Sequence, residues 1–274
     1  MQVYGLSVSG IGTIGGVTAP PPADAPRLHV TRAVGRAADP AFVSYTDDRV
    51  VLALIDEGQL VVERRPATAT YLIPHAISDD ELLHPWLVPA IAVTAGWHGR
   101  RVLHGGLVGT SGRAVALVAD KEGGKSTLLS WLAVQGEVDI YSDDLVVLDE
   151  DTAFAGPRCI DLRQPTVDNM TLDGRVRLVR DGTRWRLTLP AAPPTVTLAG
   201  VIVLEWGDTP SLEPVRPSQR LAALLPHSIG YGLPPGADGI LGFVRYPVWR
   251  LVRPKNWDAL PASAALIRRV LDGA

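Results

Sequence analysis

Short apolar runs separated by charged or turn-forming residues fill the chain from residue 27 to about residue 73. The segment "DEG" at 56–58 lies between two such runs, and this pattern predicts a hairpin with strands at 50–55 and 59–64. Before them, "APPPADAP" at 19–26 interrupts the chain. We therefore expect residues 1–77 to form a small, β-rich and mostly antiparallel N-terminal domain.

A helix is predicted to follow this domain. Ser78 precedes three consecutive acidic residues, a pattern typical of a helix N-cap with negative charge in the first turn. The helix should run towards Trp97, and Pro85 and Pro89 should kink or break it. We expect residues 78–99 to link the N-terminal domain to a second one.

The remaining chain, 100–274, alternates between strand-like and helical patterns, which indicates an α/β domain. Strands are expected in "RVLHGGLVG", "RAVALVAD", "FAGPRCIDLRQP", "LAGVIVLEWG" and "PVWRLVRP", and on both sides of the two acids in "VDIYSDDLVVLDED". Helices are expected at 125–136, 217–225 and 236–244 and at the C-terminus up to Asp272, and a hairpin around Asp-Gly in "RVRLVRDGTRWRLTLP".

One loop in this domain has the pattern of a phosphate-binding site. The sequence "ALVADKEGGKSTLL" places a glycine-rich turn between a buried strand and a helix, where backbone N–H groups and the positive helix end attract phosphate. It matches the second half of the Walker A pattern G-x-x-x-x-G-K-[ST]. The residues expected to bind a nucleotide are Asp120, Lys121, Gly123, Gly124, Lys125, Ser126 and Thr127.

Two positions depart from that pattern. Ala119 replaces the first glycine, which restricts the turn without forbidding it. Glu122 places a carboxylate about 6 Å from the expected phosphate, a repulsion of roughly 3 kcal/mol at an effective dielectric constant of about 20. Lys121 and a bound Mg²⁺ would offset much of this repulsion. A glycine-rich turn without any ligand remains the alternative interpretation.

Two adjacent acids follow the loop after one helix and one strand. Asp143 and Asp144 lie 18 and 19 residues after Lys125, at the end of an apolar run. A parallel strand at this point would lie beside the loop strand and bring its end to the phosphates. One acid could hold Mg²⁺ and the other could take a proton from an attacking hydroxyl. Neighbouring side chains on a strand point to opposite sides, so both can serve one site only if the strand ends there.

Composition limits the class of protein. Hydrophobic residues make up 46% of the 274 residues, enough for a substantial core, and the net charge of −3 argues against a nucleic-acid-binding protein. Cys159 is the single cysteine, which excludes an internal disulfide and a cysteine-based zinc site. The first residues lack the features of a signal peptide, and the apolar stretch 82–97 is too short and too interrupted to span a bilayer. We expect a soluble cytoplasmic protein that does not bind a membrane.

The combined motifs resemble the catalytic domain of the HPr kinase/phosphorylase family. The resemblance is greater still to the shorter related serine kinases of bacterial biosynthetic clusters, including those that phosphorylate lasso-peptide precursors. It covers about residues 70–272 and is carried by "LHGGLVG", "VADKEGGKSTLLSWL", "DIYSDDLVVLD", "AGPRCIDLR" and "VIVLEWGD" with "PVWRLVRP". It implies an α/β P-loop kinase domain with a phosphoenolpyruvate-carboxykinase-like mixed sheet, next to the small β-rich N-terminal domain. The bifunctional signature around "LEIRGLG" is absent, so phosphorolysis is not expected.

The resemblance also implies roles for single residues. It implies that Lys125 contacts the phosphates, that Ser126 and Asp144 hold Mg²⁺, and that Asp143 is the general base. His104 would lie near the attacking hydroxyl and this base. Either Arg158 or Arg163 would clamp the γ-phosphate, and spacing does not choose between them.

The leading hypothesis is a kinase that uses ATP and Mg²⁺ to phosphorylate a Ser or Thr hydroxyl of a peptide or small protein. Two alternatives stay open: a kinase of a small-molecule alcohol, and a degenerate nucleotide-binding scaffold without turnover. The sequence leaves a homo-oligomer open and does not identify the acceptor.

Overall fold

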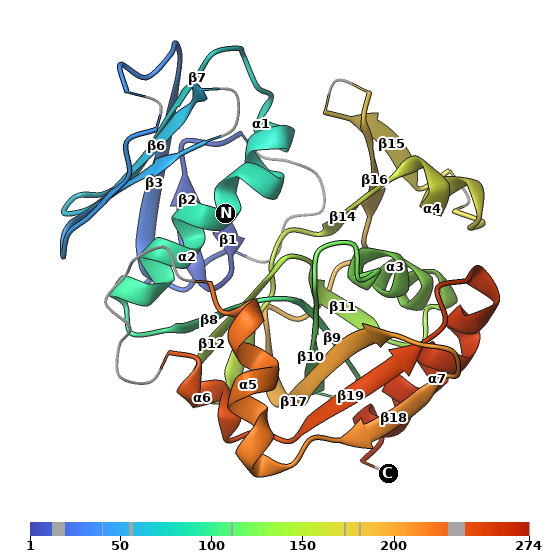
Figure 1. The fold of residues 1–274 in the computed structure, drawn as a ribbon. Helices are drawn as coiled ribbons and strands as arrows, with labels where there is room; N and C mark the ends of the chain where they lie inside the picture. The colour runs from blue at the N-terminus through green and yellow to red at the C-terminus, as the bar shows by residue number, and fades with distance from the viewer. Residues whose placement is uncertain are drawn as a thin grey trace.

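The computed structural model describes residues 1–12, 20–39, 41–54, 57–110, 112–172, 174–180, 182–229 and 239–273. The protein has a mixed α/β fold that contains three sheets and several helices within these ranges (Figure 1). Within these ranges, no helix combines the length and the apolar character that crossing a membrane requires.

The N-terminal sheet is mostly antiparallel, as predicted, with two parallel pairs among the described strands. Among the described residues it has the order β1-β2-β3-β7-β6-β5-β4, and β3 pairs in parallel with both β2 and β7. The predicted hairpin is confirmed, since β5 and β6 pair antiparallel with Leu52 opposite Leu60; Ile55 and Asp56 of its turn lie outside the described residues. The strands are β1 (Gln2–Val3), β2 (Leu6–Ser9), β3 (Arg27–Val34), β4 (Ser44–Tyr45), β5 (Arg49–Ala53), β6 (Gln59–Arg64) and β7 (Ala67–Ile73).

The predicted helix begins as expected and breaks at its first proline. Ser78 forms a capping box with Glu81, and α1 (Asp79–Glu81) continues into η2 (Leu82–Trp86) and α2 (Leu87–Trp97). His84, just before Pro85, has extended backbone angles (φ −152°, ψ 122°), because a residue that precedes proline is disfavoured in the α region. Pro89 lies in the first turn of α2, where proline is tolerated, and does not interrupt the helix.

Helix α2 is buried because it packs on both sides. Its apolar residues join a core formed by the N-terminal sheet, and the same core includes Leu145 and Val147 of the larger sheet. Figure 1 shows α1 and α2 beside the N-terminal sheet (blue), at the junction with the rest of the molecule. The linking segment is therefore part of the hydrophobic core.

The larger sheet contains nine strands among the described residues. Its main path is β11-β9-β10-β17-β13-β12-β8, and β19 adds to β17 with β18 at the edge. Strand β17 is parallel to both β10 and β19, while the other pairs are antiparallel, so the sheet is mixed. The strands are β8 (Arg101–His104), β9 (Gly106–Thr110), β10 (Arg113–Ala119), β11 (Asp139–Ser142), β12 (Leu145–Asp149), β13 (Thr152–Phe154), β17 (Thr195–Trp206), β18 (Ser211–Pro214) and β19 (Val248–Arg253).

Two expectations about this sheet were wrong. The run "RVLHGGLVG" is not one strand, because it bends at Gly105 and divides into β8 and β9. An added Cβ at Gly105 would lie 2.8 Å from the carbonyl oxygen of Leu117, so only glycine fits this bend. Strand β11 does not lie directly beside the loop strand β10, because β9 lies between them and pairs antiparallel with both.

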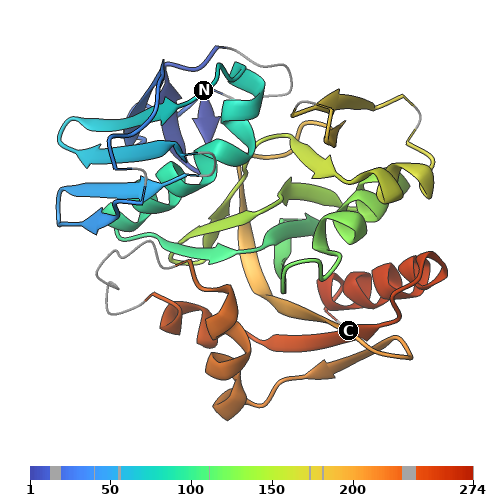
Figure 2. The ribbon, with the colours of Figure 1, turned by 45° about the horizontal axis from the view of Figure 1, so that its top comes forward.

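Helices and a third sheet cover one face of the larger sheet. Helices α3 (Lys125–Gln135) and α7 (Leu260–Leu271) pack side by side on it, as Figure 2 shows. The third sheet has the order β14-β16-β15, which confirms the hairpin expected around Asp-Gly; Asp181 lies outside the described residues.

The other elements are β14 (Cys159–Leu162), β15 (Val176–Val179), β16 (Arg184–Thr188), α4 (Gln164–Asp168), η3 (Pro217–Gln219), α5 (Arg220–Leu224), η4 (Leu225–His227), α6 (Leu241–Val244) and η5 (Trp257–Ala259). Of the helix expected at 236–244, residues 236–238 lie outside the described residues.

A buried arginine joins the third sheet to the linking segment. Arg186 of β16 is 2% exposed and donates through Nε and Nη2 to both carboxylate oxygens of Asp161, at 2.7 and 3.0 Å. It also donates to the carbonyl oxygens of Asp80 and His84, each at 2.6 Å. Burial alone would lower the pKa of Arg186, but the carboxylates outweigh it and the pKa is raised. The guanidinium therefore fixes the backbone of His84 at the break before Pro85.

Arg186→Met should reduce the free energy of unfolding by about 3–5 kcal/mol, because it leaves the carboxylate of Asp161 buried without its main partner. Urea denaturation measures this loss. The control is Arg177→Met: Arg177 also pairs with Asp80, but its side chain is 52% exposed, so its loss should cost at most about 1 kcal/mol. Equal losses in the two variants would contradict the structural role of Arg186.

Candidate active site

The glycine-rich loop has the strand–turn–helix geometry that the sequence predicts. It leaves β10 at Ala119 and enters α3 at Lys125, with Gly124 as the N-cap residue in the left-handed region (φ 73°). An added Cβ at Gly123 would lie 2.7 Å from Cβ of Ala119. Both glycines are therefore required by the backbone, and the N-terminus of α3 opens towards the surface at this loop.

A cavity of about 450 Å³ lies over the loop. All seven residues that the sequence assigns to nucleotide binding line it, and so do His104, Asp144 and Arg163. Asp161, Thr166, Arg184 and Lys255 complete its polar wall. Glu122 lines it too, so the cavity combines one helix N-terminus, five Lys or Arg side chains and four carboxylates. The helix N-terminus and the cations suit a phosphorylated ligand.

Lys125 forms ion pairs with both adjacent acids. Its ammonium contacts Oδ1 of Asp143 and lies 3.2 Å from Oδ1 of Asp144. Asp143 is 3% exposed and also accepts a hydrogen bond from Ser126 Oγ at 2.9 Å. Lys125 lines the cavity and Asp143 does not, so the ammonium lies on the cavity side of this carboxylate.

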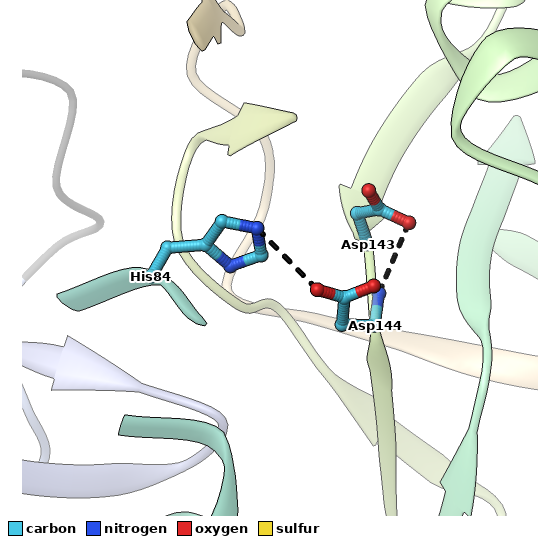
Figure 3. A group of neighbouring side chains, drawn as sticks. All are labelled: His84, Asp143 and Asp144. Carbon is cyan, nitrogen blue, oxygen red and sulfur yellow. Dashed lines mark hydrogen bonds and ion pairs between the residues drawn. The ribbon is translucent and has the colours of Figure 1, made fainter. Parts of the chain in front are cut away.

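The local backbone explains how both acids reach one ammonium. Strand β11 ends at Ser142, and Asp144 has a left-handed backbone (φ 69°), so the alternation of side chains stops between them. The bend lies opposite the bend at Gly105, whose N–H donates to the carbonyl oxygen of Asp144 at 3.2 Å. Figure 3 shows the two carboxylates on consecutive residues at this point.

The ion pairs shift the pKa values of these groups in opposite directions. Burial alone would lower the pKa of Lys125, but the two carboxylates outweigh it and the pKa is raised. Burial alone would raise the pKa of Asp144, but the positive charge of Lys125 outweighs burial and holds this pKa well below its usual range. Lys125 and Asp144 are therefore both charged at neutral pH.

His84 joins the cluster, although no role was predicted for it. Its Nε2 lies 3.4 Å from Oδ2 of Asp144, the ring is 1% exposed, and its Nδ1 has no hydrogen-bond partner within the described part of the chain. His84, Asp143 and Asp144 lie close enough together to hold a metal ion (Figure 3). The signal for His84 was its place before Pro85, where the break directs the side chain inward, but only the tertiary fold brings it to the acids.

His104 lines the cavity from the end of β8. Its neighbour across the strands is Leu145, next to Asp144, so the pairing of β8 with β12 places it beside the acids. The pKa of His104 is lowered, first because the surrounding protein desolvates the ring and then because Lys125 is positively charged. A neutral imidazole at this position can accept or donate a hydrogen bond without adding charge.

The two arginines proposed for the γ-phosphate lie in different environments. Arg158 is 5% exposed and donates to the carbonyl oxygens of Ile140 and Pro190, at 2.5 and 2.9 Å, outside the cavity. Arg163 lines the cavity and donates to the carboxylate of Glu122 at 2.9 Å. Arg163 is therefore the one of the two that lies within reach of a ligand.

Two further residues support the site and were not foreseen. Arg253 is 2% exposed, stacks on Trp206 at 4.1 Å and donates to the carbonyl oxygen of Gly123 at 2.5 Å. Burial lowers its pKa to about 10. The hydroxyl of Tyr4 donates to the carbonyl oxygen of Asp143 at 3.0 Å, so the N-terminal sheet also contacts the acidic bend. Neither contact has a sequence motif, because each joins distant segments.

The chain is distantly similar to known structures, but not to any known sequence family. No protein-family model matches the chain, and no curated protein matches it. Among solved structures, it is distantly similar to the Hpr(Ser) kinase/phosphatase from Coxiella burnetii, with a TM-score of 0.33 and 11% sequence identity. The match covers 64% of this chain and 99% of that chain. A likeness at this level does not establish the chemistry of the cavity, which depends on the residues described above.

Lys125→Met should reverse the pH dependence of stability in the acid range. In the wild type, the lowered pKa of Asp144 stabilises the fold above the unfolded value of about 3.9 and this contribution is lost as pH falls. Without the ammonium, two adjacent carboxylates repel each other, so their pKa values should rise and the fold should gain stability as pH falls from 7 to about 5. Urea denaturation across this range measures both slopes.

The control for this experiment is Lys125→Met combined with Asp144→Asn, which removes the repulsion between the two acids. The gain in stability at lower pH should then disappear. If Lys125→Met and the wild type show the same slope, the ion pairs with Asp143 and Asp144 do not govern the charge state of the cluster.

Proposed function

We propose that this protein is a kinase that uses Mg²⁺-ATP to phosphorylate a Ser or Thr hydroxyl of a peptide or small protein. The observation that carries the proposal is the convergence of Lys125, Ser126, Asp143 and Asp144 beside the glycine-rich loop. The acceptor class follows from the sequence resemblance described above.

The residues present fit the group that this reaction needs. Backbone N–H groups at the start of α3 and the ammonium of Lys125 would hold the phosphates, while Ser126 and Asp144 would hold Mg²⁺. A bound Mg²⁺-ATP supplies the transferable phosphoryl group. Arg163 would add a guanidinium on the same wall once it leaves Glu122.

Asp143 is the proposed base. Its carboxylate contacts Lys125, the residue expected at the transferred phosphoryl group, so it lies close to where a hydroxyl would attack. It accepts the hydroxyl proton as the new O–P bond forms and the bond to the β-phosphate breaks, with ADP as the leaving group. Lys125 has to move towards the phosphates first, since it covers Asp143 on the cavity side.

One contact favours the opposite assignment of the two acids. Ser126, the proposed metal ligand, donates to Asp143 rather than to Asp144, and Asp144 is the acid that lines the cavity. With the roles exchanged, Asp143 would hold the metal with Ser126 and Asp144 would take the proton. The two assignments predict opposite effects of the two substitutions below.

Asp143→Asn should lower the turnover of a peptide substrate by about 10²–10⁴-fold and leave the affinity for Mg²⁺-ATP unchanged, because a base acts only when the hydroxyl attacks. Asp144→Asn should instead raise the Mg²⁺ concentration needed for activity. Phosphate transfer from labelled ATP measures turnover, and isothermal titration with Mg²⁺ and a non-hydrolysable ATP analogue measures affinity.

Asp208→Asn, an exposed acid in the turn between β17 and β18, is the control and should change neither quantity. Loss of nucleotide binding in Asp143→Asn, with binding retained in Asp144→Asn, would exchange the two roles. Tight nucleotide binding without transfer to any hydroxyl acceptor would reject the kinase in favour of a scaffold.

Glu122→Gly should tighten ATP binding by up to about tenfold, or about 1.4 kcal/mol, because it removes a negative charge beside the phosphates and frees Arg163. Glycine also suits the left-handed backbone of this position (φ 66°). The gain should shrink as salt rises, since the side chain of Glu122 is 59% exposed and its charge is screened. Titration with ATP at two salt concentrations measures both effects.

Glu57→Gly is the matched control. Glu57 has a positive φ of 63° and pairs with Arg36 at 2.8 Å, but it does not line the cavity. This substitution should leave ATP affinity unchanged. Weaker ATP binding in Glu122→Gly would mean that the acid helps to form the phosphate site.

A further inference from the structure

A second cavity, which we call the apolar groove, lies next to the candidate active site and has a volume of about 720 Å³. One wall comes from β4, β5 and the residues around them, including Val43, Tyr45 and Leu54. The floor includes Pro85 and Trp86 of η2. The far wall comes from Arg180 and Thr183, between β15 and β16, and from Arg184 at the start of β16. The groove therefore runs from the edge of the N-terminal sheet to the third sheet.

The apolar groove and the catalytic cavity share one lining residue. Arg184 lines both of them, at the start of β16. The same segment η2 that forms the floor of the groove carries His84, which contacts Asp144 in the active site. A chain lying in the groove would therefore approach the catalytic cavity at Arg184.

The groove has exposed apolar side chains at one end. Phe42, Val43 and Tyr45 are 46%, 44% and 42% exposed, and all three lie within four consecutive residues. Val43 and Tyr45 line the groove, at the strand that forms the edge of the N-terminal sheet among the described residues. Clustered exposed apolar residues of this kind indicate a binding surface.

At its other end the groove is lined by Arg184, which has no ion-pair partner among the described residues. Glu81, the carboxylate that lines the groove, accepts hydrogen bonds from Ser78. Arg184 donates to the carbonyl oxygen of Thr183. Its neighbour Arg180 is already paired with Asp161 at 2.6 Å, and Arg163 with Glu122. An anionic group on a ligand would therefore find its partner at Arg184, between the two cavities.

We propose that the apolar groove binds the acceptor polypeptide in an extended form, with apolar side chains against Val43 and Tyr45 and a carboxylate at Arg184, close to the hydroxyl that is phosphorylated. This inference rests on the proposed kinase function and specifies its substrate. In that substrate, Asp or Glu lies a few residues before or after the Ser or Thr, and apolar residues lie farther from the Ser or Thr in the same direction along the chain. The apolar wall and the lone guanidinium together select this class over a small alcohol, which would need neither.

The test uses a peptide library with a central serine, in which each flanking position is fixed in turn, and labelled ATP. The wild type should select Asp or Glu close to the serine and apolar residues farther along on the same side. Arg184→Ala should lose the acidic selection and reduce kcat/KM for the selected peptide by about tenfold, while KM for ATP changes less than about twofold.

Val43→Asp should lose the apolar selection and retain the acidic one. The matched control is Leu241→Asp, an apolar residue of α6 that is 55% exposed and does not line the groove, and this change should alter neither selection. Both variants have an exposed side chain replaced, so both should fold, and circular dichroism checks this.

The contrary outcomes are separable. If the wild type phosphorylates peptides without these preferences, or the variants keep them, the groove does not bind the acceptor and the kinase function stands. If Arg184→Ala raises KM for ATP and not for the peptide, Arg184 serves the nucleotide and the groove proposal is wrong.

If Val43→Asp instead dissociates a dimer, the groove binds a second copy of this chain. If no peptide is phosphorylated while a small alcohol is, the proposed function itself is wrong, and the groove proposal is rejected with it.

Discussion

The site depends on a single electrostatic constraint: one buried ammonium faces two carboxylates on consecutive residues. Two adjacent acids repel each other when buried, and here the ammonium of Lys125 lies against both of them. This arrangement requires the strand to stop at Ser142 and Asp144 to adopt a left-handed backbone. The bend at Asp143 and Asp144 meets this requirement, and the neighbouring bend at Gly105 supports it through a hydrogen bond to Asp144. The short loop before α3 brings Lys125 to the two acids. The same charges that stabilise the cluster are the ones that a phosphorylated ligand would rearrange, so stability and chemistry use the same side chains.

Much of the local structure could be predicted from the sequence, because it depends on neighbours in the chain. Ser78 with its acids predicted the helix start, and the turn residues predicted both hairpins. The pattern around Gly124 and Lys125 predicted a strand–turn–helix, and the structure has one. Asp143 and Asp144 were singled out by their spacing, and they do lie at Lys125, although the roles assigned to them remain predictions.

The rest depends on contacts between distant segments, which periodicity does not encode. The sequence placed β11 beside β10, but β9 inserts between them, since a hairpin partner competes with a crossover strand for the same edge. His84 looked like part of a linking helix, and its approach to Asp144 depends on Arg186, which binds its carbonyl oxygen from 102 residues away. The apolar groove likewise combines segments that no single pattern connects.

The hydroxyl of Tyr4 binds the carbonyl oxygen of Asp143, a partner 139 residues farther along the chain. Contacts of such long sequence separation close large loops, and chains rich in them fold slowly. The acidic bend therefore acquires its final environment only when the first strands and the middle of the chain have met. A form in which only the C-terminal two-thirds is organised would contain the glycine-rich loop but lack the contact of Tyr4 with the acidic bend.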